Sequence, residues 1–135
     1  MSNIMKTLTA AITLLFVTIM VSGCSQKAAR VSVEGSVVFQ GKPVDNATVI
    51  IRPEAGPEAG SVTDANGKFV IPKDCGPMAG KVQIMVEKFT DVQEKDHFGQ
   101  TVTIPKPALP DGVQSKRIPF TLTNGRNTLK INLDE

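Results

Sequence analysis

From Val31 to the end of the chain, apolar residues recur at every second position. A period of two puts alternate side chains on one face of an extended strand, whereas a helix repeats every three to four residues. The predicted inward-facing sets are Val31, Val33, Val37 and Phe39; Ala47, Val49 and Ile51; Phe69 and Ile71; Val82, Ile84 and Val86; and Ile118, Phe120 and Leu122 opposite Leu129, Ile131 and Leu133. The pattern therefore predicts one antiparallel all-β sandwich.

Turn residues separate these predicted strands. The sequence Asn124-Gly125 lies between two alternating segments, and "DANG" (residues 64–67) lies between two others. Such pairs accept positive φ at little cost and are typical of β-hairpins. Both sites predict tight antiparallel connections.

Residues 89–116 depart from this pattern. They hold few strand signals apart from "QTVTIP" (residues 100–105), which predicts a short strand, and Pro105, Pro107 and Pro110 keep the following chain extended. Long loops in compact domains are usually functional or mobile. We expect a long irregular loop here, with Phe89, His97 and Phe98 as its candidate partner contacts.

The only large apolar block is at the start of the chain. Residues 1–6 carry one positive side chain, and residues 8–21 are apolar apart from three threonines. This block is shorter than the roughly 20 residues of a membrane-spanning helix. It suits the h-region of a signal peptide, and the chain is predicted to be exported.

The block ends in "VSGC" (residues 21–24), which resembles the lipobox of bacterial lipoproteins. In that family the Cys thiol receives a diacylglyceryl group, the peptide before it is removed, and the new amine is commonly acylated, for example with palmitate. The resemblance implies a cleaved signal peptide over residues 1–23, a lipid anchor at Cys24, a tether over 24–30 and a folded domain over 31–135. An ordinary signal peptide with Cys24 as a free thiol is the alternative. By the same resemblance, Ser25 favours the outer membrane over the inner.

The folded part carries a second resemblance. "EGSVVFQGKPVDNATVIIRP", "GSVTDANGKFVI" and "GPMAGKVQIMVEK" are similar to a carboxypeptidase-regulatory-like domain, and "TNGRNTLKINL" to its close. This resemblance implies a seven-stranded Greek-key sandwich of the transthyretin (prealbumin) type. The matching positions are turn glycines and core residues, which specify fold more than function.

Several kinds of chemistry find little support. The net charge of +2 does not favour nucleic acid, and the absence of Trp and Tyr removes the usual platforms for bases and sugars. His97 is the only histidine, and no nucleophile motif surrounds Cys75 or any serine. The transthyretin-like enzymes that hydrolyse 5-hydroxyisourate use more than one His and a C-terminal Tyr-Arg-Gly-Ser, which this chain lacks. We predict that the protein is not an enzyme.

Metal binding is also disfavoured. Asp64 and Asn66 offer oxygen ligands but lack the twelve-residue calcium loop. A zinc site made of Asp91, Glu94, Asp96 and His97 would have a single nitrogen ligand. We predict no metal or other cofactor, and read Cys75 as a small loop residue without a disulfide partner.

We therefore expect a membrane-anchored lipoprotein of the cell envelope, facing the periplasm, whose domain is a non-catalytic structural or binding module. Its expected partners are the membrane, through the acylated N-terminus, and another envelope protein or polymer. The alternative is weak binding of a glycan or peptide by residues 89–116, and a hydrolase is a distant third.

Overall fold

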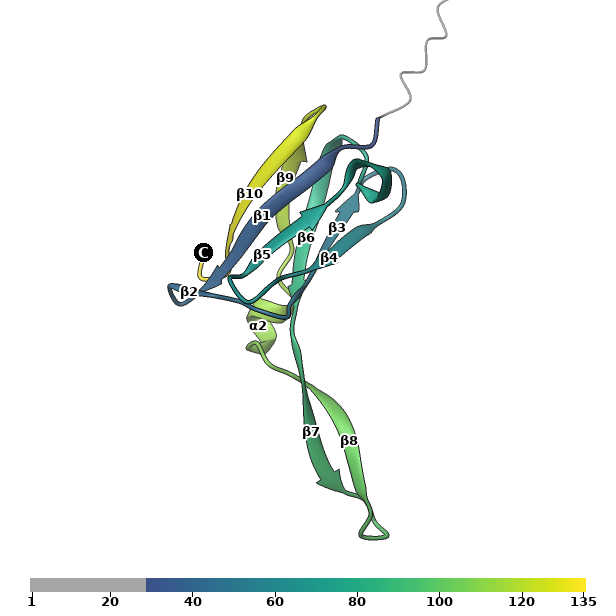
Figure 1. The fold of residues 1–135 in the computed structure, drawn as a ribbon, viewed down its shortest axis with the longest axis vertical. Helices are drawn as coiled ribbons and strands as arrows, with labels where there is room; N and C mark the ends of the chain where they lie inside the picture. The colour runs from purple at the N-terminus through teal and green to yellow at the C-terminus, as the bar shows by residue number, and fades with distance from the viewer. Residues whose placement is uncertain (1–28) are drawn as a thin grey trace, which may run out of the picture.

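The computed structural model describes residues 29–135, which form an all-β fold (Figure 1). The predicted signal peptide over residues 1–23 and the predicted lipidation site Cys24 lie outside the described residues. The elements in chain order are β1 (Ser32–Phe39), β2 (Lys42–Pro43), β3 (Thr48–Pro53), β4 (Ala59–Val62), β5 (Lys68–Ile71), the 3-10 turn η1 (Lys73–Cys75), β6 (Gly80–Glu87), β7 (Phe89–Lys95), β8 (Thr101–Pro107), the short helix α2 (Asp111–Gln114), β9 (Ile118–Leu122) and β10 (Arg126–Asn132).

Two four-stranded sheets enclose the core. In one, β1 pairs in parallel with β10 and antiparallel with β5 and β2; the other has the order β4-β3-β6-β9. One cluster of buried side chains draws on both sheets: Val31, Val33, Val37, Val49, Ile51, Phe69, Ile71, Val82, Ile84, Val86, Leu122, Leu129, Ile131 and Leu133 among others. The alternation predicted from the sequence is confirmed at these positions, and the architecture is compatible with a sandwich. The prediction that the strands are all antiparallel is wrong, because β1 and β10 run parallel.

Three predicted inward residues are less buried than expected. Ile118, at the start of β9, is only partly buried against the core. Phe39 lies at the end of β1 and is only partly buried against the core. Phe120 is 41% exposed, which contradicts its assignment to the core. The reason is its place on β9, an edge strand that pairs only with β6, so one side of the ring has no neighbouring strand to cover it.

Buried polar groups tie the β2–β3 loop to the core. The Thr63 hydroxyl donates to the Val44 carbonyl at 2.7 Å and accepts from the Ala47 amide at 2.9 Å. Asp64 begins the predicted turn between β4 and β5: its Oδ1 accepts from the amides of Asn66 and Lys68, both at 2.9 Å. The residues considered as calcium ligands therefore form a hydrogen-bonded turn. Because β4 and β5 belong to different sheets, as do β9 and β10, the two hairpins predicted at residues 64–67 and at Asn124-Gly125 are wrong: both turns carry the chain from one sheet to the other.

Residues 89–116 are not the irregular loop that the sequence led us to expect. They form the hairpin β7–β8, which projects from the sheets, followed by α2 (Figure 1). The strand expected at residues 100–105 is confirmed as part of β8. The error arose because both strands are largely solvated, so their side chains do not alternate between core and solvent.

We expect Gly35→Ala to destabilise the domain. A Cβ at this position of β1 would lie 2.3 Å from the Leu129 carbonyl oxygen of β10 and 3.0 Å from the Phe69 ring. The strands must separate, at a cost of about 1–3 kcal/mol. Gly112→Ala in α2 is the control, because a Cβ there meets no described atom within 4 Å. Urea denaturation of both variants tests this, and equal midpoints would contradict it.

Candidate functional site

The β7–β8 hairpin is the part of the domain that stands apart from the core. Its seven residue pairs run from Phe89↔Pro107 at the base to Lys95↔Thr101 near the tip. Isolated two-stranded hairpins are marginally stable in water. Four of its apolar side chains are at least 37% exposed: Phe89, Phe98, Val102 and Ile104. The hairpin is therefore a candidate contact surface.

The turn at the tip repeats the chemistry of the turn between β4 and β5. In "DHFGQ", Asp96 Oδ1 accepts from the amides of Phe98 at 2.9 Å and Gln100 at 2.8 Å. Gly99 has φ +78°, and its amide donates to the Asp96 carbonyl. "DANGK" (residues 64–68) makes the same bonds, with φ +71° at Gly67. The turn holds His97 and Phe98 in the solvent, and Phe98 is 89% exposed.

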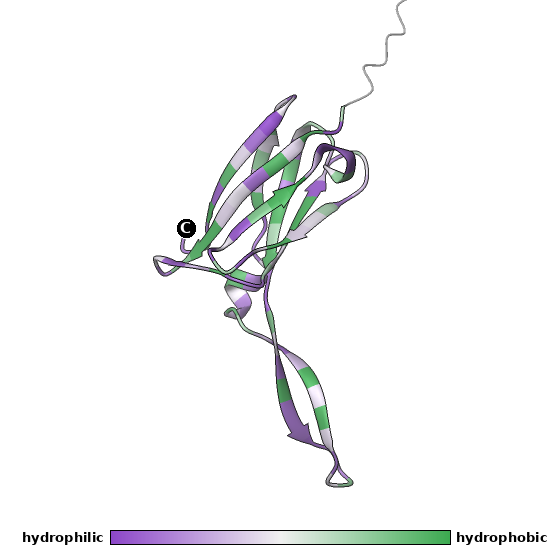
Figure 2. Cartoon of the chain, viewed as in Figure 1, coloured by the Kyte–Doolittle hydropathy of each residue, from purple (hydrophilic) through white to green (hydrophobic). Residues whose placement is uncertain are grey.

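One face of the hairpin is apolar in its middle. Val92 on β7 pairs with Ile104 on β8, and Val102, opposite Glu94, lies on the same face two pairs nearer the tip. Figure 2 shows apolar segments on β8 and a hydrophilic end on β7. An ion pair between Lys106 and Glu94 joins the two strands on this face. The face thus combines a small apolar stripe with an internally neutralised pair of charges.

The two long edges of the hairpin differ in hydrogen-bonding capacity. The Asp96 amide donates to the Gln100 carbonyl, and the Ala108 amide to the Lys88 carbonyl. Because hydrogen-bonded pairs alternate along an antiparallel ladder, the even-numbered residues of β7 bond to β8 and the odd-numbered ones point their amides outward. On β8 two of the outward positions are prolines, Pro105 and Pro107, whereas on β7 every outward position has an N–H.

The base of the hairpin is tied to the domain. Lys88 Nζ bonds Asp45 Oδ1 at 2.9 Å, and Leu109, just after β8, is buried in the core. The hydrogen bond from Lys88, a backbone hydrogen bond and the Lys88 charge hold the pKa of Asp45 below its usual value. A lowered carboxyl pKa means that the pair contributes at neutral pH, and that this contribution is lost as the pH falls through that pKa.

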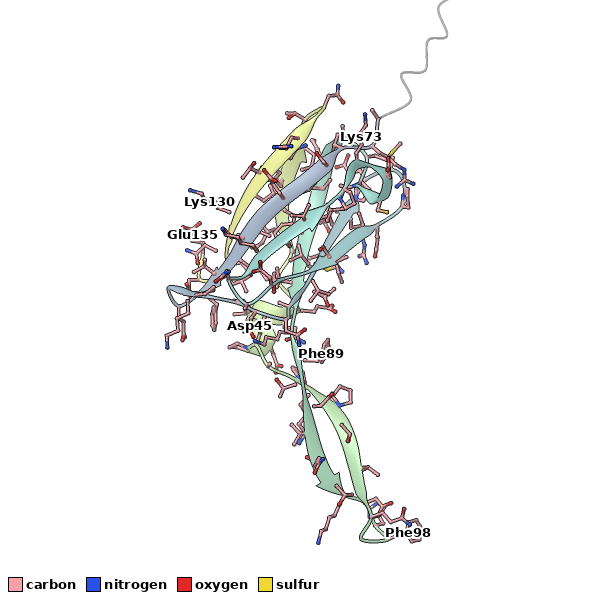
Figure 3. The ribbon with its side chains drawn as sticks, viewed as in Figure 1. Asp45, Lys73, Phe89, Phe98, Lys130 and Glu135 are labelled. Carbon is pink, nitrogen blue, oxygen red and sulfur yellow. The ribbon has the colours of Figure 1, made fainter. Side chains whose placement is uncertain are left out.

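The three candidate contact residues do not form one cluster. Phe89 lies at the base of the hairpin, and Phe98 at its tip (Figure 3). His97 is beside Phe98 in the turn. The sequence did not indicate the surface between them, the β7 edge and the Val92–Ile104 stripe.

Other surface features are less specific. Within residues 29–135, no three His, Cys, Asp or Glu side chains are grouped so that they could hold a metal ion. Cys75 is an exposed free thiol in η1. An open depression of about 630 Å³ lies over the strands β3, β6 and β9 and includes Arg52, Lys81 and Phe120 in its lining. Arg52 is already paired with Glu58, so no group of convergent polar side chains marks this depression as a site.

Comparison with known proteins does not assign the chain to a family. No protein-family model matches it, and no curated protein matches it. Among solved structures, it is similar to a 9R-lipoxygenase from Cyanothece PCC8801, with 16% sequence identity and a TM-score of 0.40. The match covers 75% of this chain and 16% of the lipoxygenase chain. A likeness this distant assigns no activity.

The twin turns allow a matched test of the hairpin's independence. We expect Asp64→Ala to lower the free energy of unfolding by about 1–2 kcal/mol, because its turn joins two core strands and loses two hydrogen bonds. Asp96→Ala removes the same bonds, but should leave global unfolding unchanged and abolish amide protection in β7 and β8. Urea denaturation and hydrogen exchange measure the two effects. An equal loss of global stability in both variants would show that the hairpin belongs to the cooperative core.

Proposed function

We propose that this chain is a bacterial envelope lipoprotein, anchored through acylated Cys24, whose domain displays the β7–β8 hairpin to a partner. The proposal includes the finer fold assignment, a seven-stranded Greek-key domain of the transthyretin-like, carboxypeptidase-regulatory-like type. The two sheets support that assignment: apart from the two-residue β2, they contain β1, β3, β4, β5, β6, β9 and β10.

The observation that carries the proposed function is the direction of the hairpin. The described chain enters β1 at one end of the domain, and the hairpin projects from the opposite end (Figure 1). A tether over residues 24–30 spans at most roughly 25 Å. A domain held this close to a membrane by its N-terminal side would point the hairpin, with Phe98 at its tip, away from the lipid surface.

The anchor is compatible with the rest of the chain. No helix within residues 29–135 is long and apolar enough to cross a membrane. Two or three acyl chains on one cysteine hold a protein firmly at a membrane, whereas a single chain binds only marginally. The outer membrane and a periplasm-facing domain are part of the proposal, on the strength of Ser25.

The domain's proposed role is non-catalytic. The hairpin offers an aromatic tip, a short apolar stripe and a free strand edge, which are features that bind other proteins. Weak binding of a peptide by residues 89–116 uses the same features and is the second candidate. Glycan binding has less support, because Phe98 is the only aromatic side chain at the tip.

Intact mass spectrometry of membrane-extracted protein tests the anchor. We expect a chain that begins at Cys24 and carries a diacylglyceryl group, with or without an N-acyl chain. Cys24→Ala should give uncleaved or soluble protein that still folds, because the core begins at Val31. A mature chain with an unmodified Cys24 would contradict the anchor.

Site-specific photo-crosslinking in intact cells tests the role of the hairpin. A photoreactive phenylalanine analogue at Phe98 should give a defined adduct with an envelope component. The matched control is the same analogue at Asn124, an exposed residue in the turn between β9 and β10. Adducts from position 124 but none from position 98 would contradict display of the hairpin tip.

A further inference from the structure

We infer that the outer edge of β7 pairs with the same edge of a second copy of this chain, which joins the two hairpins into one four-stranded sheet. This inference does not rest on the proposed anchor. Because the two β7 strands run antiparallel, the N-terminal sides of the two domains lie at opposite ends of the dimer (Figure 1). Two copies anchored in one membrane can therefore form it only with their hairpins lying along the membrane, which is an alternative to the outward display of the tip proposed above. Its starting point is the difference between the hairpin's two edges. The outward amides of β7 belong to Phe89, Asp91, Gln93 and Lys95, and by the register of the hairpin none of them faces β8.

The strand is self-complementary when two copies run antiparallel about a two-fold axis at Val92. Phe89 then pairs with Lys95 of the other copy, and Asp91 with Gln93, so that all seven residues of β7 have partners. The outward residues form the hydrogen-bonded pairs, and each copy contributes equally. Isologous contacts of this kind close into dimers.

This register also extends the apolar stripe. Val92 of one copy lies opposite Val92 of the other, and each is already paired with its own Ile104. Four apolar side chains thus form a continuous row across the joined sheet, flanked by Val102 of each hairpin. Cross-strand apolar pairs stabilise a sheet by about 0.2–1 kcal/mol each. The row covers side chains that are partly exposed in the single chain.

The charges permit the pairing. Glu94 is neutralised within its own hairpin by Lys106. The remaining charges of β7 are Asp91 and Lys95, one of each sign. In the antiparallel register, Asp91 of one copy lies diagonally across from both Lys95 and Asp91 of the other, and the charges of Asp91 and Lys95 on the two strands sum to zero. Shifting the register by two residues toward the base would instead place Asp91 directly opposite Asp91, which is destabilising.

The prolines of β8 limit the assembly to two copies. The joined sheet has the order β8-β7-β7-β8, and both of its outer edges are β8 strands. Pro105 and Pro107 remove two outward donors from each of these edges. Prolines at such positions oppose further strand addition. The sequence of the hairpin therefore leaves one edge open and blocks the other.

Disulfide trapping tests the register in the full chain, in detergent solution, with both native cysteines replaced (Cys24→Ser, Cys75→Ser). Val92 would face its own copy in a non-hydrogen-bonded pair, with Cα atoms about 4.5 Å apart, which a disulfide spans. Val92→Cys should therefore form a covalent dimer at least tenfold faster than Thr103→Cys, an exposed position on the outer edge of β8. Equal rates would overturn the proposed pairing.

Proline substitution tests the edge itself. Gln93→Pro removes an outward donor without breaking a bond to β8, and should weaken dimerisation at least tenfold in sedimentation velocity. Thr103→Pro makes the same change on β8 and should leave dimerisation unaltered. A wild-type chain that stays monomeric at every concentration, or a dimer that Gln93→Pro does not weaken, would overturn the inference. The disulfide result stands independently of any loss of hairpin structure in the proline variants.

Discussion

The parallel pairing of the first strand with the last is the interaction on which the rest of the fold depends. β1 lies inside its sheet, with β10 on one side and β5 and β2 on the other. Its partners in β10 are almost a whole domain away in sequence. Pairing the two strands therefore costs the conformational entropy of closing a long loop. Gly35 allows the close approach: its missing side chain leaves room for the Leu129 carbonyl and the Phe69 ring.

The hairpin is stabilised by different interactions from those that hold the two sheets together. Its strands have almost no share in the core, so it is held by its own ladder, by the Asp96 turn and by the anchoring of its base through Lys88 and Leu109. Such an element adds little to the stability of the domain and places apolar groups in water. A contact that the hairpin makes outside the folded core explains both properties. Of its two edges, β8 carries prolines and β7 carries free amides, so β7 is the edge that can form backbone hydrogen bonds in such a contact.

Much of the fold could be predicted from alternation alone, because one face of each core strand is buried and the other is solvated. Val33, Ile51, Ile84 and Ile131 all lie where the period of two places them. The hairpin was missed because neither of its faces is buried, so the alternation of Val102 and Ile104 signals no core. A usable signal was present: "DHFGQ" has the spacing of "DANGK", with Asp and Gly in the same positions. Phe120 was misplaced because alternation gives the face of a strand but not its distance from the sheet edge.

Hydrogen exchange of the unmodified chain at low and high concentration tests the role of the β7 edge most directly. Dimerisation through this edge should slow the amide exchange of Asp91, Gln93 and Lys95 as the concentration rises. The outward amides of Thr101 and Thr103 on β8 should exchange quickly throughout. Fast exchange on both edges at all concentrations would contradict the pairing of β7 strands, and protection confined to β8 would contradict the blocking role of its prolines.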